Sequence, residues 1–66
     1  MINEKAVLDK VNALLKNGDE AYFYYGTLFV TTSDEVAGHV LSMLQHMFDF
    51  AVLDSREGDE FVYDFA

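Results

Sequence analysis

The chain has 66 residues, which is enough for one domain but leaves only a small core that needs efficient packing or a partner for stability. It contains no cysteine and two histidines, so a disulfide framework is excluded and little is available for a metal site. Apolar residues make up 52% of the chain, which indicates an ordered globule, and the net charge of −8 argues against direct binding to nucleic acids or anionic membranes.

The charge is unevenly distributed. Residues 1–16 hold three lysines against two acids, a sum of +1, whereas residues 17–66 hold ten acids against one arginine, a sum of −9. A field of this sign attracts basic protein surfaces, although the acids could equally serve only to keep a small aromatic protein soluble. The first residues lack the pattern of a secretory signal, and no apolar run approaches the roughly 20 residues that span a bilayer. We therefore expect a soluble cytoplasmic protein.

Residues 3–17 have the periodicity of an amphipathic helix. The apolar stripe consists of Val7, Leu8, Val11, Leu14 and Leu15. Asn3 is placed to cap the start, Lys16 falls in the predicted last turn, and Gly18 is placed to end the helix.

Residues 20–32 are aromatic and β-branched with one glycine, which predicts a β-hairpin. A type II′ turn at Gly26-Thr27 would place Tyr25 opposite Leu28. Strand alternation then divides the hairpin into a core face and an aromatic outer face. The predicted core face carries Ala21, Phe23, Tyr25, Leu28 and Val30, and the outer face carries Tyr22, Tyr24, Phe29 and Thr31.

A second helix is predicted from a capping box formed by Thr32 and Glu35, and it runs to about Phe48. Its wide apolar stripe contains Val36, Ala37, Val40, Leu41, Met43, Leu44, Met47 and Phe48. The remaining face is polar but has no acid and no lysine, which is unusual for a solvated helix in so acidic a chain. We therefore predict that this face is a self-association surface, formed by Gly38, His39, Ser42, Gln45 and His46.

The last third predicts a short strand over 50–53, a polar loop over 54–59 and an alternating strand over 60–65. Which face of the 50–53 strand is buried stays open. The element order α-β-β-α-β-β predicts a single α+β domain over residues 1–66, with a four-stranded antiparallel sheet and two helices on one face. A shift of 29 residues aligns the two helical stripes, so a weak αββ pseudo-repeat over 3–32 and 33–65 is a further hypothesis.

We expect no enzyme, no cofactor and no metal site. His39 and His46 are seven residues apart, about 10 Å along a helix, which is too far for one metal ion. No nucleophile is paired with a base, and the acid pairs are adjacent residues that diverge on a strand or cap a helix.

The function we predict is a small acidic interaction module that docks on a basic, nucleic-acid-binding surface of a target protein by charge mimicry. In composition it resembles phage-encoded inhibitors and DNA mimics, which is an analogy only. Tyrosines beside carboxylates suit a basic partner. The predicted partner-binding residues are Tyr22, Tyr24, Phe29, Asp54, Glu57, Asp59, Glu60 and Asp64. The alternative is a structural homodimer or assembly subunit in which the charge serves only solubility.

Overall fold

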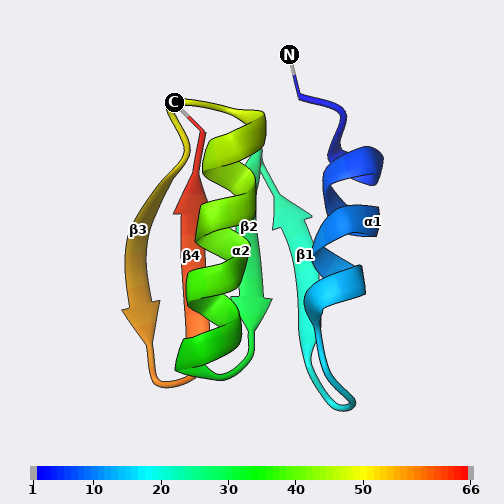
Figure 1. The fold of residues 1–66 in the computed structure, drawn as a ribbon. Helices are drawn as coiled ribbons and strands as arrows, with labels where there is room; N and C mark the ends of the chain where they lie inside the picture. Colours follow the sequence, from blue (N-terminus) through cyan, green and yellow to red (C-terminus); the bar gives the residue numbers. More distant parts are fainter. Residues whose placement is uncertain (1, 66) are drawn as a thin grey trace.

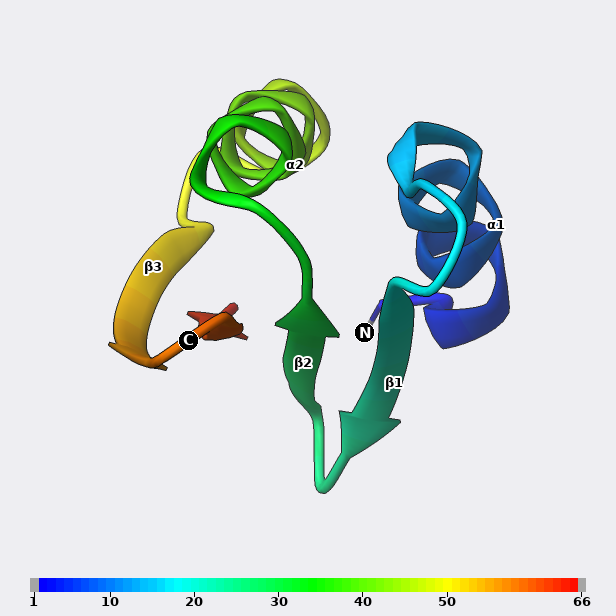
Figure 2. The same cartoon turned by 90° about the horizontal axis from the view of Figure 1, so that it is seen from below.

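The computed structural model describes residues 2–65 as two helices over one sheet. The elements are α1 (Glu4–Leu14), β1 (Glu20–Tyr24), β2 (Thr27–Thr31), α2 (Asp34–Met47), β3 (Val52–Glu57) and β4 (Glu60–Asp64). The four strands lie in the order β1-β2-β4-β3, and every neighbouring pair is antiparallel. Both helices lie on the same face of the sheet (Figures 1 and 2). The predicted α+β architecture is confirmed.

Helix α1 begins where it was predicted but ends three residues early. The Asn3 side chain accepts a hydrogen bond from the Ala6 amide at 3.1 Å, which caps the start. The end is set by Asp19, whose carboxylate accepts the Lys16 amide at 2.9 Å. Because that amide is taken by a side chain, it cannot continue the helical ladder. Lys16 therefore lies beyond the last turn, and Gly18, at φ 94°, belongs to the following loop.

The β1–β2 hairpin forms, but its turn and register differ from the prediction. Tyr24 pairs with Thr27, so the two-residue loop is Tyr25-Gly26 rather than Gly26-Thr27. Both loop residues have positive φ, 51° and 78°, the requirement of a type I′ turn, whose twist matches the strands. The observed pairing differs from the predicted pairing by two residues: Leu28 pairs with Phe23 instead of Tyr25. Because side chains alternate with a period of two, the strand residues stay on their predicted faces. Tyr25 alone was placed wrongly: it is 91% exposed at the hairpin tip and takes no part in the core.

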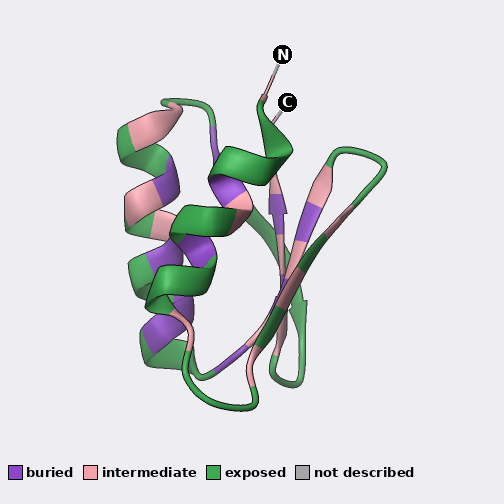
Figure 3. Cartoon of the chain, turned by 90° about the vertical axis from the view of Figure 1, so that its right-hand side faces the viewer, coloured by how far each residue is buried: buried purple, intermediate pink, exposed green. Residues whose placement is uncertain are grey.

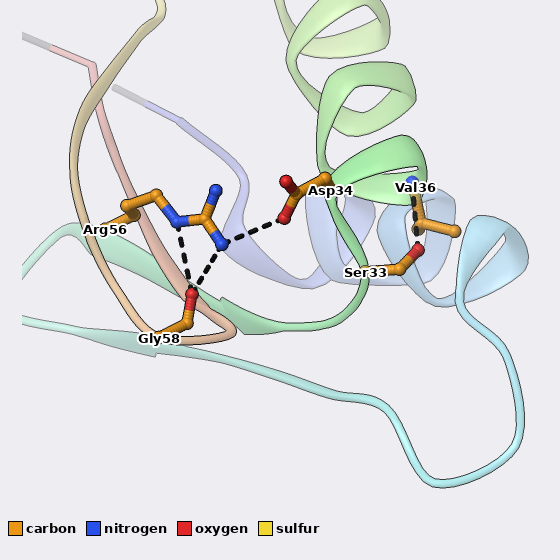
Figure 4. Close-up of polar contacts among 5 residues, drawn as sticks. All are labelled: Ser33, Asp34, Val36, Arg56 and Gly58. Carbon is orange, nitrogen blue, oxygen red and sulfur yellow. Dashed lines mark hydrogen bonds and ion pairs between the residues drawn. The ribbon is translucent and has the colours of Figure 1, made fainter.

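The N-cap of α2 is Ser33 and not Thr32, because the Thr32 side chain is hydrogen-bonded to Asp19 instead. The Ser33 hydroxyl accepts the Val36 amide at 3.3 Å (Figure 4). Thr32 is 3% exposed, and its hydroxyl donates to the Asp19 carboxylate at 2.8 Å. The capping box of Thr32 with Glu35 was therefore wrong by one residue. Asp19 joins the loop after α1 to the loop before α2.

The second hairpin corrects the prediction for residues 50–59. The strand covers Val52–Glu57, so most of the expected polar loop is paired with β4 and the turn is only Gly58-Asp59. The register shifts between Leu53 and Ser55, which leaves Asp54 in a bulge. Phe50 precedes the strand. All six residues of β3 are exposed, as expected for a short edge strand with charges and a bulge.

The core lies between the helices and the inner face of the sheet, as the buried segments of Figure 3 show. Its apolar members are Val7, Val11, Leu28, Val30, Val36, Ala37, Val40, Leu44, Ala51, Phe61 and Tyr63. The buried Tyr63 hydroxyl donates to the Ala37 carbonyl at 2.8 Å, which links β4 to α2. This pairing also settles the open question about β3: Leu53 is opposite the inward Tyr63, so its side chain is on the helix side, and Val52 is on the other.

Arg56 connects the β3–β4 hairpin to α2 through polar contacts (Figure 4). Its guanidinium lies 4.5 Å from the centroid of the Phe61 ring and donates twice to the Gly58 carbonyl, at 3.1 and 2.7 Å. The same group forms an ion pair of 2.9 Å with Asp34 in the first turn of α2. The side chain thus lies on the helix side of the sheet.

The two halves share the element order αββ, but not the predicted offset. The residue pairs that close the hairpins are Tyr24–Thr27 and Glu57–Glu60, so the turns are 33 positions apart, from 24 to 57. A shift of 29 residues therefore does not superpose the strands. A duplication of an αββ unit stays a prediction.

Candidate protein-interaction face

The sheet face opposite the helices carries no other layer within residues 2–65 (Figures 2 and 3). We call it the open face. Strand alternation and the pairing register define its members: on β2 and β4 they alternate with buried residues, and on β1 and β3 they are the residues paired with those outward positions. They are Glu20, Tyr22, Tyr24, Thr27, Phe29, Thr31, Val52, Ser55, Glu57, Glu60, Val62 and Asp64.

An aromatic row crosses the middle of the open face. Tyr22 pairs with Phe29, and Phe29 pairs with Val62 on β4. The Tyr22 and Phe29 rings are stacked, with centroids 5.2 Å apart and an interplanar angle of 9°. Tyr22 remains 45% exposed, so the stack with Phe29 leaves part of its side chain accessible. The row is thus a partly open aromatic platform.

Two more tyrosines extend this platform toward the hairpin tip. Tyr24 is 62% exposed and meets Tyr25 edge to face, with ring centroids 4.6 Å apart. Tyr25 holds a positive φ, which is uncommon for a bulky residue. Sequence reasoning missed Tyr25 as a surface residue because the turn type was wrong. The sequence did contain a signal for the correct turn, because type I′ turns favour glycine at the second loop position, where Gly26 lies in the Tyr25-Gly26 turn.

An acidic row lies beside the aromatic row, at the end of the sheet remote from Tyr25. It runs across all four strands through the pairs Glu20–Thr31, Thr31–Glu60 and Glu60–Glu57. Adjacent strands are about 4.8 Å apart, so the row places three carboxyl groups within about 15 Å. Glu57 and Glu60 are directly opposite each other, an arrangement that destabilises a sheet when both are ionised.

The two rows are in contact through Tyr22 and Glu60. The Tyr22 hydroxyl donates to Glu60 Oε2 at 3.4 Å. Partial removal from water, followed by the charge and hydrogen bond of Glu60 and the charge of Glu20, raises the pKa of the Tyr22 phenol above its ordinary value. The environment of the phenol is therefore both partly dry and negative.

The basic residues all lie off the open face. Lys5 and Lys10 are on α1, with Lys5 paired to Asp9 at 3.3 Å, and Lys16 follows that helix. Arg56 is on the helix side of β3, where it binds Asp34. The four acids of the open face thus have no cation among them.

The structure gathers six of the eight predicted partner-binding residues on the open face. These are Tyr22, Tyr24, Phe29, Glu57, Glu60 and Asp64. Asp54 lies apart in the exposed bulge, and Asp59 lies in the turn, where its carbonyl accepts the Thr32 amide at 2.9 Å. Glu20 was missed as a site residue, although its alternation with Ala21 already placed it beside Tyr22 on one face.

The predicted self-association residues of α2 are all exposed. These are Gly38, His39, Ser42, Gln45 and His46. Gln45 donates to the Ala51 carbonyl at 3.1 Å, and His46 Nδ1 lies 3.1 Å from the Ser42 carbonyl. Apart from the nearby backbone of α2, no part of the described chain lies close to the position that a side chain at Gly38 would occupy, so the surface there is open.

Across residues 2–65, the structure contains no pocket and no group of three or more side chains placed to hold a metal ion. Neither described helix is long and apolar enough to cross a membrane. Comparison of the chain with protein-family models, curated proteins and solved structures found no match.

Proposed function

We propose that this protein is a small acidic interaction module that docks through its open face on a basic surface of another protein. The target surface is one that binds nucleic acid, and the module acts as an inhibitor by occupying it. The observation that carries the proposal is the placement of an aromatic row beside an acidic row on an uncovered sheet face, with every basic side chain elsewhere.

The chemistry of the two rows is complementary to a nucleic-acid-binding groove. Such grooves present lysine and arginine at spacings that neutralise phosphates. Carboxylates spaced across four strands can take the place of phosphates, while tyrosine and phenylalanine supply the desolvated area that anchors an interface. Charge directs the encounter and fixes orientation, and the aromatic row supplies most of the buried apolar contact.

The test is competition with DNA. The protein is titrated into complexes of a labelled duplex with each member of a panel of basic DNA-binding proteins, and displacement is followed by fluorescence anisotropy. We expect displacement for at least one target, with an affinity that falls about tenfold or more between about 50 and 300 mM salt. Binding that is indifferent to salt would contradict charge mimicry.

A pair of charge-matched variants makes this test specific to the open face. Glu57→Gln/Glu60→Gln removes two charges from the acidic row, and Glu4→Gln/Glu35→Gln removes two from the first turns of the helices. We expect the first variant to weaken displacement about tenfold and the second to change it less than about twofold. Equal losses would show that net charge alone, and not this face, produces the effect.

The exposed outer face of α2 favours a second candidate, a homodimer in which two copies pack through this helix. A copy of an acidic chain meets least repulsion where the surface carries no acid, and this face carries none. Sedimentation velocity at micromolar concentration tests the proposal. A dimer that Ser42→Glu disrupts would support it, and a monomer at every concentration would overturn it.

A further inference from the structure

We propose that the open face contains an arginine-binding site, in which a guanidinium group of the partner stacks on the Tyr22 ring and donates to the Glu60 carboxylate. The inference rests on the proposed docking function and names the side chain that the partner presents. Glu20 and Glu57 lie on either side of Glu60 in the acidic row, and they strengthen the preference for a cation.

The geometry of Tyr22 matches a planar cation. One side of the ring is stacked on Phe29, which fixes its orientation, and the 45% exposure leaves area for a second stacked plane. Guanidinium groups stack on aromatic rings and donate in the plane of the group. The carboxylate near the phenol oxygen is therefore in position for the N–H groups of a stacked guanidinium.

Glu60 keeps the capacity to accept further hydrogen bonds. Its only contact from Tyr22 is a long one of 3.4 Å to Oε2, and an ionised carboxylate accepts at both oxygens. In the described part of the chain, Glu20, Glu57 and Glu60 take part in no ion pair. An arginine can form two parallel bonds to such a carboxylate, whereas an ammonium group acts as a point charge.

The acidic row is also unfavourable in the free protein. Glu57 and Glu60 are directly opposed across β3 and β4, and like charges in that position repel. At the same place, partial burial and then the charge of Glu60 raise the pKa of the Tyr22 phenol. A bound guanidinium would offset the repulsion between Glu57 and Glu60, and this relief would strengthen binding.

The experiment compares two peptides of equal length and charge, in which glycine alternates with either three arginines or three lysines. Both are titrated into the full chain by NMR at one low salt concentration. We expect the arginine peptide to bind about five- to tenfold more tightly and to shift the resonances of Tyr22 and Glu60 most. Equal affinity, or no binding of either peptide, would overturn the arginine site.

Variants locate the preference within the face. Tyr22→Leu should reduce the arginine-to-lysine ratio to about one, whereas Phe50→Leu, which also removes an exposed aromatic ring but lies outside the open face, should leave the ratio unchanged. An unchanged ratio in Tyr22→Leu would overturn the assignment. If that variant does not fold, Glu57→Gln/Glu60→Gln provides the test. We expect it to raise the Tm by about 2–4 °C and to abolish the preference for the arginine peptide. A retained preference in this variant would overturn the site.

The outcomes separate this inference from the docking proposal. Equal affinities of the two peptides at low salt, with shifts on the open face and weaker binding when the titration is repeated at about 300 mM salt, would overturn the arginine site and support docking by charge. Shifts confined to the helices would overturn both.

Discussion

Tyr63 introduces a hydroxyl group into the core, where it has one partner. The side chain is fully buried, and its hydroxyl donates to the Ala37 carbonyl at 2.8 Å. Burial raises the pKa of Tyr63 to about 12. We expect Tyr63→Phe to lower the free energy of unfolding by about 1–1.5 kcal/mol at neutral pH, measured by urea denaturation.

The pH dependence of the same residue has a definite sign. The folded state holds the Tyr63 proton more tightly than the unfolded chain, whose tyrosine pKa is about 10. The contribution of this group is therefore complete below pH of about 10 and is lost as the pH rises toward 12. The stability difference between the native protein and Tyr63→Phe should shrink over that window. A difference that stays constant would contradict the assignment.

Asp19 acts at the same scale and shows the opposite pH dependence. The Lys16 amide, then the Thr32 hydroxyl, stabilise the ionised carboxylate and lower the pKa of Asp19 below its ordinary value. Its contribution is present above that value and is lost as the pH falls through the lower folded pKa. We expect Asp19→Asn to be less stable than the native protein at pH 7 and to converge with it in acid, as followed by circular dichroism. Thr32→Val should reproduce part of the loss.

At the scale of elements, the turn of the first hairpin holds a non-glycine residue in an unfavourable backbone conformation, which lowers stability. Tyr25 and Gly26 both require positive φ, and asparagine tolerates this conformation at the first loop position better than tyrosine. We expect Tyr25→Asn to raise stability by about 0.5 kcal/mol, after the loss of its contact with Tyr24, and Gly26→Ala to lower it by about 1 kcal/mol. Thermal unfolding measures both changes. A stability loss in Tyr25→Asn would contradict the turn assignment.

All six residues of β3 are exposed, so the contacts of Arg56 are a large part of the side-chain packing of this strand. The ion pair with Asp34 is solvent-exposed and contributes little, so the contact with Phe61 and the bonds to Gly58 carry most of the effect. We expect Arg56→Lys to lower the free energy of unfolding by about 1 kcal/mol. Asp34→Asn is the control and should cost about 0.5 kcal/mol or less. Equal losses would assign the effect to the ion pair.

For the whole molecule, the charge of −8 is unfavourable for folding. Self-repulsion opposes the compact state, so screening by salt should raise stability. We expect the free energy of unfolding to rise by about 0.5–1 kcal/mol between about 10 and 200 mM NaCl, measured by urea denaturation at each concentration. Glu57→Gln/Glu60→Gln should show a smaller rise. A stability that falls with salt would show that favourable ion pairs dominate.

What the sequence alone determined depends on local periodicity. The helical stripe around Val7 and Val11, the order of six elements and the division of the first hairpin into two faces follow from the 3.6- and 2-residue repeats of side-chain direction. The exposed aromatic half of the candidate face was predictable for this reason. Even a wrong turn preserved it, because a register shift of two residues leaves every side chain on its own face.

The tertiary structure decided what depends on contacts between distant segments. Placing β4 between β2 and β3 brings Glu60 into line with Glu20 and Glu57, and no local pattern contains that alignment. Likewise, α1 ends early where the Asp19 carboxylate, which also binds Thr32 in the loop before α2, accepts the Lys16 amide. Side-chain alternation predicts which residues share a face, whereas strand order and register determine which of them become neighbours.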